Sequence, residues 1–389
     1  MSLKEAIKAE ARRLGFQWVG VTTPDPPAHL DVVERWLQAG RHAEMAYLAT
    51  ERARYLRADP LGILPECRSI LVLGMHYAAP ERFPAPESSG IYGRIAAYAW
   101  GEDYHLVFAK RLQSLITFVE DWTAKRIPHR WYTDTGPVLE RELAQRAGLG
   151  WIGKNTCLIH PKAGSYFLLA EVFLGLDLPP DPPFTADHCG SCTRCIQACP
   201  TACILPDRTI DAGRCISYLT IELKGAIPTE MRSQMGNWVF GCDVCQQVCP
   251  WNVRFATPEG DAAFAPRPAV PSPDLIAEMA LSAQDFSRKF RRSAVKRAKR
   301  RGYLRNVAIA LGNLASYANR TLVEQALGAL SQALCHDDEP LVRGHAAWAL
   351  GRIGTPPARR ALSAAIGEET DTGVLAEVRA ALDSTVEIQ

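Results

Sequence analysis

The spacing of apolar residues in the N-terminal half changes repeatedly between the period of a helix and that of a strand. Ile7, Ala11 and Leu14 recur on one helical face behind Ser2 and Glu5, a pair typical of a helix start. Strands are predicted at 18–23, 70–75 and 166–174, and a long amphipathic helix is predicted at 108–122. The pattern predicts a mixed domain of helices and strands, and an α+β fold class for the chain.

Proline-rich stretches divide the chain. The run LPPDPPF ends at Phe184 and leads into a cysteine-rich segment, and residues 256–275 are again rich in proline and alanine. Such stretches are typical of joints between packed units. At 389 residues, 47% of them hydrophobic, the chain is long enough for two or three cores. We therefore predict three domains, at 1–184, 185–255 and 256–389.

The last third of the chain contains an internal repeat, in which LRNVAIALGNLA is echoed by VRGHAAWALGRIG. The pairs Leu311-Gly312 and Leu350-Gly351 are 39 residues apart, close to the spacing of HEAT-type helical pairs. Two or so repeats are too few to be stable alone, so we expect them to pack on the preceding domains. An ordinary bundle of alanine-rich helices is the alternative.

Eight of the twelve cysteines form two tight groups with one partner between them. The first group has the spacing C-x2-C-x2-C-x3-C-P of two-cluster ferredoxins, in which the fourth cysteine binds the other cluster. The second group, C-x2-C-x3-C-P, lacks the middle cysteine, which Cys215 can replace. The predicted ligands of one [4Fe-4S] cluster are Cys189, Cys192, Cys195 and Cys249, and those of the other are Cys199, Cys215, Cys242 and Cys245.

Zinc is the alternative occupant of this segment, because CxxC pairs also suit a tetrahedral zinc ion. The Cys-Pro endings of both groups favour the clusters. Four cysteines have no ligand spacing and are interpreted as small buried hydrophobes, namely Cys67, Cys157, Cys203 and Cys335. Cys203 lies near the first group, so a ligand role stays open there.

The charge of the chain is nearly balanced, with a formal net charge of +2, but it is unevenly distributed. Residues 288–305 contain ten Lys or Arg and no acid, which suits a polyanion partner. No run of about 18 apolar residues predicts a membrane span, and the N-terminal sequence lacks the features of a signal peptide. We therefore expect a cytoplasmic protein without membrane association, in a compartment that keeps its cysteines reduced.

Several segments resemble epoxyqueuosine reductases, namely RIAAYAWGEDYH, WYTDTGPVLERELAQRAGLGWIGKNT, the first cysteine motif, CISYLTIELKGAIP and GCDVCQQVCPWN. The resemblance spans nearly the whole chain. It implies a nitroreductase-like cobalamin domain, an inserted two-cluster ferredoxin-like domain and HEAT-like α-helical repeats. It also implies removal of the epoxide oxygen of epoxyqueuosine in the tRNA anticodon loop. The implied partners are tRNA carrying epoxyqueuosine and an unidentified electron donor, and we expect a monomer.

Opening an epoxide to an alkene takes two electrons and two protons, and the leaving oxygen must be protonated, so a general acid is required. Asp134, in the sequence YTDTGP, matches the proton donor of the family that the chain resembles. A turn aspartate that caps a helix starting near Pro137 is the alternative. The family's Arg-Tyr-Ala segment is Ala97-Tyr98-Ala99 here, so a contact at Ala97 must come from the backbone or a neighbour.

Cobalamin is implied by the resemblance alone, because the sequence has no Asp-x-His-x-x-Gly motif. Lys154 and Asn155, in a loop that follows Gly150, have donors suited to corrin amides or phosphate. The other predicted contacts can equally be ordinary surface residues. The full predicted set is Arg57, Ala97, Tyr98, Asp134, Lys154, Asn155, Leu158, Ser217, Thr220, Glu222 and Lys224.

The basic run suits contacts with tRNA phosphates, since helical spacing would place several cations on one face. A solvated helix is the alternative. The predicted tRNA contacts are Arg288, Lys289, Arg291, Arg292, Lys296, Arg297, Lys299, Arg300, Arg301 and Arg305. Two rival functions remain: a dehalogenase-like corrinoid reductase of a small molecule, and a non-catalytic electron-transfer or scaffold protein. The basic run argues against the first, because a small substrate needs no such surface.

Overall fold

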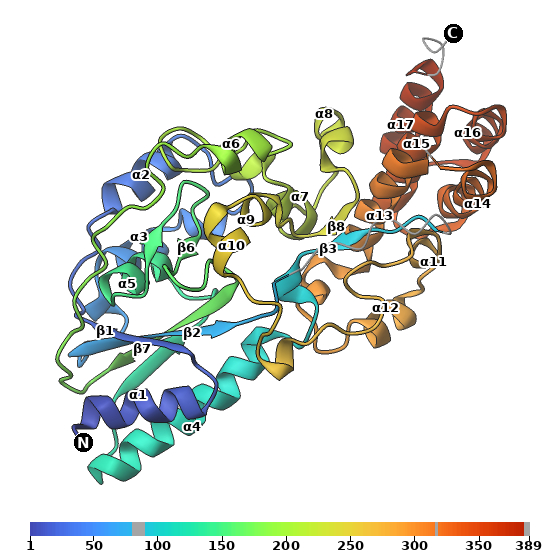
Figure 1. Cartoon of the computed structure of the whole chain (residues 1–389). Coiled ribbons are helices and arrows are strands. Elements are labelled where there is room, and N and C mark those ends of the chain that lie inside the picture. The colour runs from blue at the N-terminus through green and yellow to red at the C-terminus, as the bar shows by residue number, and fades with distance from the viewer. Residues whose placement is uncertain (80–89, 316–317, 385–389) are drawn as a thin grey trace. The chain divides into compact units, whose positions relative to one another are not determined.

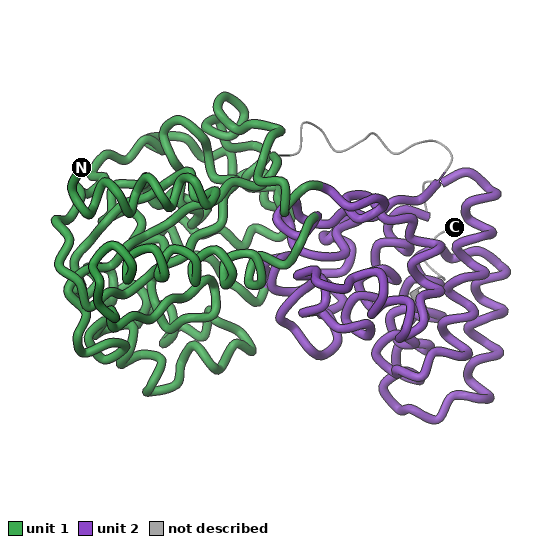
Figure 2. The backbone as a smooth tube through the Cα atoms, turned by 90° about the horizontal axis from the view of Figure 1, so that it is seen from below, with its two compact units in different colours: residues 1–81, 101–213, 243–265 green, residues 82–100, 214–242, 266–389 purple. Residues whose placement is uncertain are grey.

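The computed structural model describes residues 1–79, 90–315 and 318–384, and it divides into two compact units, each built from several stretches of chain (Figure 2). Unit 1 comprises residues 1–81, 101–213 and 243–265, and unit 2 comprises residues 82–100, 214–242 and 266–389. The two units differ from the three successive domains predicted from the sequence. The middle of the cysteine-rich segment packs with the C-terminal helices, for a reason described below.

An antiparallel sheet of four strands forms the centre of unit 1 (Figure 1). Its strands, in spatial order, are β1 (Trp18–Thr22), β2 (Ser69–His76), β7 (Phe167–Leu174) and β4 (His129–Tyr132). Every residue of β2 is buried, because the strand is central and both faces of the sheet are covered. The predicted strands are confirmed to within a few residues.

Helices cover the two faces of this sheet (Figure 1). Helices α1 (Leu3–Arg13) and α4 (Tyr104–Thr123) lie on one face, where the rings of Phe16 and Phe108 meet edge to face with centroids 5.4 Å apart. Helix α5 (Glu140–Arg146) packs on the other face against β7 and β2. The predicted Ser2 cap and amphipathic helix are confirmed. Trp122, at the end of the predicted apolar stripe of α4, is 48% exposed.

The remaining elements of unit 1 are short. Before and beside the sheet lie α2 (Leu30–Gln38), η1 (Ala46–Leu48), α3 (Glu51–Ala58) and η2 (Pro60–Gly62). Strands β5 (Trp151–Ile152) and β6 (Leu158–Ile159) form a hairpin. The cysteine segments contribute the short helices α6 (Arg194–Ala198), η4 (Ala212–Arg214), α9 (Val244–Gln247) and α10 (Pro250–Phe255). Helix η6 (Ala262–Phe264) follows them. Short elements leave most of this segment as loops, which suits chain that must wrap a cofactor.

Unit 2 is mainly helical. Two short parallel strands, β3 (Arg94–Ile95) and β8 (Trp238–Phe240), lie beside η3 (Ala97–Ala99), α7 (Ile216–Ile221), α8 (Thr229–Arg232) and η5 (Ser233–Met235). The chain continues through α11 (Leu275–Met279), α12 (Ala283–Lys289), η7 (Ala294–Ala298), α13 (Lys299–Ala315), α14 (Arg320–His336), α15 (Pro340–Ile353), α16 (Pro356–Glu368) and α17 (Thr372–Ser384). None of the described helices combines the length and apolar composition needed to cross a bilayer.

Helices α13, α15 and α17 stack as one layer, and α14 and α16 lie beside them, as expected for helical repeats (Figure 1). The repeated glycines lie where successive inner helices approach each other. A Cβ atom on Gly312 would lie 2.9 Å from the Cα of Ala349, and one on Gly351 would lie 2.9 Å from the Cα of Ala381. The Leu-Gly repeat therefore marks a real structural repeat, with backbone packed against backbone.

Arg305 explains why residues 214–242 belong to unit 2. Its guanidinium is fully buried and donates to the backbone carbonyls of Leu219, Leu223 and Gly225 at 2.6 to 3.0 Å. The neighbouring Asn306 donates to the carbonyls of Thr220 and Val239 within the same unit. These bonds satisfy carbonyls that would otherwise be buried without donors, so they tie α7 and β8 to the first repeat helix.

Candidate active site and iron-sulfur ligands

The predicted acid, Asp134, lies in the turn between β4 and α5. Its side chain is exposed, and its backbone adopts φ +60°, a left-handed conformation that is uncommon for a residue other than glycine. Tyr104 of α4 donates from its hydroxyl to Oδ2 of Asp134 at 2.7 Å, and the Asp134 amide donates to Oε1 of Glu140 at 2.5 Å. Strained residues of this kind cluster at functional sites, where the surroundings must hold them in place.

The capping alternative for Asp134 is excluded by the position of the helix. Helix α5 begins at Glu140, three residues later than the sequence suggested, and its N-cap is Leu139, which makes no side-chain cap bond. Asp134 lies six residues before the helix starts. Its conformation therefore has a different cause from helix capping.

Two acids lie behind Asp134. Glu171, in β7, is completely buried, and burial followed by the charge of Glu140 raises its pKa well above the ordinary value. Burial and then the charge of Asp134 raise the pKa of the half-buried Glu140 to about 7. The site therefore contains carboxyls with different proton affinities, an arrangement that suits proton transfer near neutral pH.

The four predicted ligands of the first cluster all belong to unit 1. Burial raises the pKa of Cys195, and the nearby Cys189 and Cys249 raise it further. Cys189 and Cys249 also pack in one apolar cluster, so thiols from two distant motifs lie near each other, which the sequence could suggest only from spacing. Lys154 donates to the backbone carbonyls of Gly190 at 2.7 Å and Cys192 at 3.0 Å, so it braces the first cysteine loop.

Aromatic rings pack beside two of these thiols, those of Cys189 and Cys249. Trp151 Nε1 donates to Sγ of Cys189 at 3.5 Å, and the Trp151 ring meets those of Phe184, His188 and Trp251 at centroid distances of 5.0 to 5.7 Å. Such a shell lowers the local dielectric and limits access of water to the ligands. Both effects tune the potential of an iron-sulfur cluster.

The predicted ligands of the second cluster are divided between the units, with Cys199 and Cys245 in unit 1 and Cys215 and Cys242 in unit 2. Cys203 lies beside Cys199, with Sγ atoms 3.4 Å apart, and a hydrogen bond from Cys203 is the main cause that lowers the pKa of Cys199 to about 5. A low thiol pKa favours the thiolate that binds metal. Cys203 is itself almost completely buried.

The structure also tests the cysteines that were interpreted as buried hydrophobes. Cys67 and Cys203 are buried, Cys157 is half-buried, and Cys335 is exposed. The prediction is therefore wrong for Cys335, because it lies on the outer surface of α14 rather than between helices.

Several predicted cofactor contacts have side chains already occupied within their own unit. Arg57 is buried and donates to the carbonyl of Leu48 at 2.7 Å, and Leu158 is part of the hydrophobic core. Thr220 is fully buried, donates to the carbonyl of Ile216 and accepts from the amide of Gly241. A cofactor contact through these three side chains is therefore not supported, because interior packing occupies them.

The other predicted cofactor contacts differ in the exposure and hydrogen bonding of their side chains. Asn155 is buried, its Oδ1 accepts from the Cys157 amide, and its Nδ2 donor has no partner among the described residues. Ser217 is half-buried. In unit 2 Ala97 is buried and Tyr98 half-buried, Glu222 forms an ion pair with Arg297, and Lys224 is exposed and donates to the carbonyl of Ile221.

The basic run is not a single helix. It crosses the end of α12, a turn, the short helix η7 and the start of α13, so the expected single helical face is wrong. Arg305 is buried, which excludes a phosphate contact for it in this structure. Lys289 and Arg300 form ion pairs with Glu278 and Asp337 and are partly buried, and Arg301 is half-buried. The exposed members are Arg288, Arg291, Arg292, Lys296, Arg297 and Lys299.

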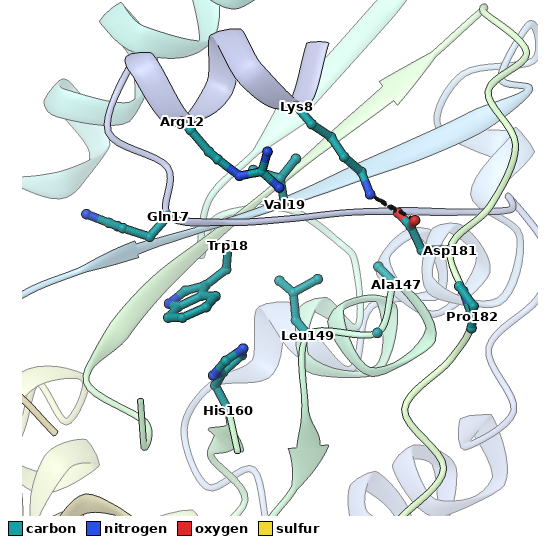
Figure 3. A pocket seen from close by; sticks show the side chains of 11 residues that line it. Lys8, Arg12, Gln17, Trp18, Val19, Ala147, Leu149, His160, Asp181 and Pro182 are labelled. Carbon is teal, nitrogen blue, oxygen red and sulfur yellow. Dashed lines mark hydrogen bonds and ion pairs between the residues drawn. The ribbon is translucent and has the colours of Figure 1, made fainter. Parts of the chain in front are cut away.

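A pocket of about 440 Å³ opens beside β1 in unit 1 (Figure 3). Its walls include Lys8, which forms an ion pair with Asp181 at 2.8 Å, and Trp18, whose ring lies 3.6 Å from that of His160 between centroids. None of the predicted catalytic, cluster or cofactor residues lines it. The pocket is therefore separate from the candidate active site.

Comparison with known families agrees with this organisation. Residues 188–252 match a 4Fe-4S double cluster binding domain, residues 57–135 match the family described as epoxyqueuosine reductase QueG, and residues 289–383 match HEAT repeats. With the grouped thiols and the helical layers, these matches define an iron-sulfur oxidoreductase that carries two [4Fe-4S] clusters and C-terminal HEAT repeats.

Individual relatives narrow this class. The chain is 41% identical over 353 residues to epoxyqueuosine reductase of Pseudomonas aeruginosa, covering 90% of this chain and 95% of the relative. It is 38% identical to that of Escherichia coli, covering 90% and 89%. A solved epoxyqueuosine reductase with an epoxyqueuosine-modified tRNA-Tyr stem loop matches with a TM-score of 0.90 and 31% identity, over 99% of both chains. The chain belongs to the epoxyqueuosine reductase family.

A second solved relative bears on the loop that contains Asp134. The epoxyqueuosine reductase of Bacillus subtilis, in a structure described with its catalytic aspartate loop swung out of the active site, matches with a TM-score of 0.87 and 30% identity over 98% of both chains.

Sequence reasoning did not find Tyr104, Glu140 or Glu171. A signal existed for Glu171, because a single acid interrupts the apolar strand FLLAEVFL.

Proposed function

We propose that this protein reduces epoxyqueuosine in the tRNA anticodon loop to queuosine, removing the epoxide oxygen with two electrons and two protons. The observation that carries the proposal is the Asp134 turn, in which Tyr104 and Glu140 hold a strained, exposed carboxyl within the unit that contains the first cysteine group. The relatives described above bear this activity in their names. No observation favours a dehalogenase-like reaction on a small molecule.

Asp134 is the proton donor in this proposal. When the C–O bond breaks, the oxygen leaves far more readily as a hydroxyl than as an alkoxide, so a proton must reach it in the transition state. Tyr104 occupies Oδ2, which leaves Oδ1 of Asp134 to carry that proton. The exposure of the side chain makes it accessible to a base extended from an RNA loop.

The two clusters, when bound, would supply the electrons of this reaction. The ligand sets remain as the spacing predicts, with Cys189, Cys192, Cys195 and Cys249 for one cluster and Cys199, Cys215, Cys242 and Cys245 for the other. The coupling of three thiols of the first set and their apolar surroundings support that assignment. Ferredoxin-like clusters reach potentials of roughly −400 mV or lower, which a demanding reduction requires.

Cobalamin is the second cofactor of the proposal, and when bound it supplies low-valent cobalt that delivers electrons to the substrate. The best-suited residue for holding it is Asn155, because a buried amide donor without a partner fits a corrin amide oxygen or phosphate. Lys154 lies beside it, but its ammonium group already donates to two carbonyls. Lys154 would have to exchange one of these bonds to contact the cofactor.

The tRNA surface consists of the exposed cations of unit 2, which are Arg288, Arg291, Arg292, Lys296, Arg297 and Lys299. They lie on consecutive elements from the end of α12 to the first residue of α13, so they can follow a phosphate backbone. A tRNA substrate also favours a cytoplasmic location. The electron donor is a separate reductant, and one copy of the chain carries all the proposed ligands, so a monomer is sufficient.

Turnover of modified tRNA tests the proposal. Reduced protein with both clusters is incubated with epoxyqueuosine-containing tRNA, with and without cobalamin, and the nucleosides are analysed by mass. Asp134→Asn should lower the rate at least about 100-fold, because it keeps the size of the side chain but removes the acid. Its iron content and tRNA affinity should not change. Asp121→Asn, at an exposed acid of α4, is the matched control. Cobalamin-independent turnover, or wild-type turnover by Asp134→Asn, contradicts the proposal.

A further inference from the structure

A buried acid lies in the sheet behind the catalytic turn. Glu171 is in the middle of β7, paired in register with Val72 of β2 and Tyr132 of β4, and it has no exposed surface. Neither of its carboxyl oxygens has a hydrogen-bond donor among the described residues. An ionised carboxylate is strongly disfavoured in such surroundings, so Glu171 is a neutral carboxylic acid that has a proton to donate.

Glu140 is the second acid of this group. Glu140 and Glu171 influence each other's pKa, and both pKa values are raised first by burial. The pKa of Glu140 is about 7, so Glu140 exchanges its own proton near neutral pH while Glu171 keeps its proton. The other charged groups facing Glu140 are Asp134 and Arg141, and Arg141 donates to the carbonyl of Thr156.

Glu140 also contacts the catalytic turn directly. Its Oε1 accepts from the amide of Asp134 at 2.5 Å, and this bond holds a residue with φ +60°. The charge of Asp134 acts on both Glu140 and Glu171, so the three carboxyls form one electrostatic group. Since Glu140 is half-buried, it can also exchange protons with solvent.

We propose that Glu140 positions Asp134 and returns a proton to it during turnover, and that the buried Glu171 stays a neutral acid within the same electrostatic group. This inference rests on the proposed function, because only a reaction that consumes two protons requires the acid to be recharged. Glu140 and Glu171 are positioning residues in this scheme, since they act on the substrate only through Asp134.

The proton balance is as follows for one turnover. The epoxide takes up two electrons and two protons, both of its C–O bonds break, a C=C bond forms and water leaves. Asp134 gives the first proton to the epoxide oxygen and becomes a carboxylate. An O–H bond on Glu140 then breaks as one forms on Asp134, which gives the second proton. Two protons from solvent then restore Glu140 and Asp134 to their acid forms, which replaces the two protons that the epoxide consumed.

The pH dependence of kcat separates proton transfer from positioning. Wild-type kcat should fall as pH rises through about 7, where Glu140 loses its proton. Glu140→Gln keeps an oxygen that can accept from the Asp134 amide, yet it should lower kcat about 10-fold to 100-fold and abolish this fall. Glu140→Asp should restore a titrating limb. Glu51→Gln, the exposed first residue of α3, is the matched control and should behave as wild type.

A purely structural role predicts a different result, in which Glu140→Gln retains both the wild-type kcat and the wild-type alkaline limb. That outcome overturns the inference. If wild-type protein itself does not convert the modified tRNA, the proposed function fails instead, and the measurement described next still tests the carboxyl pair.

Protein without tRNA or cobalamin provides the independent test. Because the folded-state pKa of Glu140, about 7, exceeds its ordinary 4.5, the stability from its proton is complete below about pH 4.5 and is lost as pH rises through about 7. Glu140→Gln should lack this loss in the free energy of unfolding. Glu171→Gln, a neutral isostere, should fold and should remove a buried carboxylic-acid band from the infrared spectrum above pH 7. Identical infrared spectra for Glu171→Gln and wild type overturn the inference.

Discussion

The hydroxyl of Tyr104 donates to Oδ2 of Asp134 at 2.7 Å, so a residue at the start of α4 fixes one oxygen of the catalytic carboxyl. Tyr104→Phe removes only this donor. We expect kcat to fall about 10-fold with little change in KM for tRNA, because a hydrogen bond to a charged group is worth about 1.5 to 3 kcal/mol. Tyr55→Phe removes another tyrosine-aspartate bond, at 3.3 Å to Asp59, on an exposed helix. Equal effects of the two variants would contradict a specific role for Tyr104.

Cys199 and Cys203 allow a sharp test of ligand assignment, because their sulfur atoms are only 3.4 Å apart. Cys199→Ala should lower the iron content of anaerobically reconstituted protein from about eight to about four per chain. Cys203→Ala should retain about eight. The measurement is iron and sulfide analysis with electron paramagnetic resonance of the reduced protein. The opposite result would make Cys203 the ligand.

The exposed cations from α12 to the start of α13 should account for a defined part of the salt dependence of tRNA binding. Each lost phosphate contact lowers the slope of log affinity against log salt by roughly 0.7 to 0.9. Lys296→Gln with Lys299→Gln should therefore reduce the slope by roughly 1.5 and weaken binding several-fold at low salt. Lys125→Gln with Arg126→Gln, at exposed positions after α4, is the control. An unchanged slope would remove this surface from the proposal.

The repeat glycines have an energetic consequence that can be measured. Gly312→Ala forces a methyl group against the backbone of Ala349 and should lower the free energy of unfolding by about 1 to 3 kcal/mol. Gly328→Ala, in α14, meets no atom within 4 Å and should instead raise stability by up to about 1 kcal/mol through helix propensity. Urea denaturation followed by circular dichroism compares the two. Destabilisation by both variants would contradict a special role for Gly312.

The features that sequence predicted well are those set by local periodicity or spacing. The strands, the helix α4 and the Leu-Gly repeat are confirmed because a period of apolar residues determines which face is buried. Cysteine spacing indicated two clusters for the same reason, since the intervals between the thiols are a local property of each motif.

Features that depend on contacts between distant segments could not be predicted from local periodicity or spacing. Arg305 looked like one more cation in a basic run, yet its guanidinium reaches carbonyls about 80 residues earlier. Tyr104 precedes Asp134 by 30 residues and meets it only because α4 lies under the sheet. The charge pattern alone therefore predicted too large a phosphate surface.

Arg305 and Asn306 anchor α7 and β8, so the C-terminal helices have a structural role in addition to the proposed binding of tRNA. The tethered stretch lies between Cys215 and Cys242, so the first repeat helix anchors the peptide that carries two of the four proposed ligands of one cluster. A shortened protein that ends before α13 should therefore be deficient in electron delivery as well as in affinity for tRNA. Loss of the C-terminal helices during evolution would therefore require a new way to hold the peptide between Cys215 and Cys242.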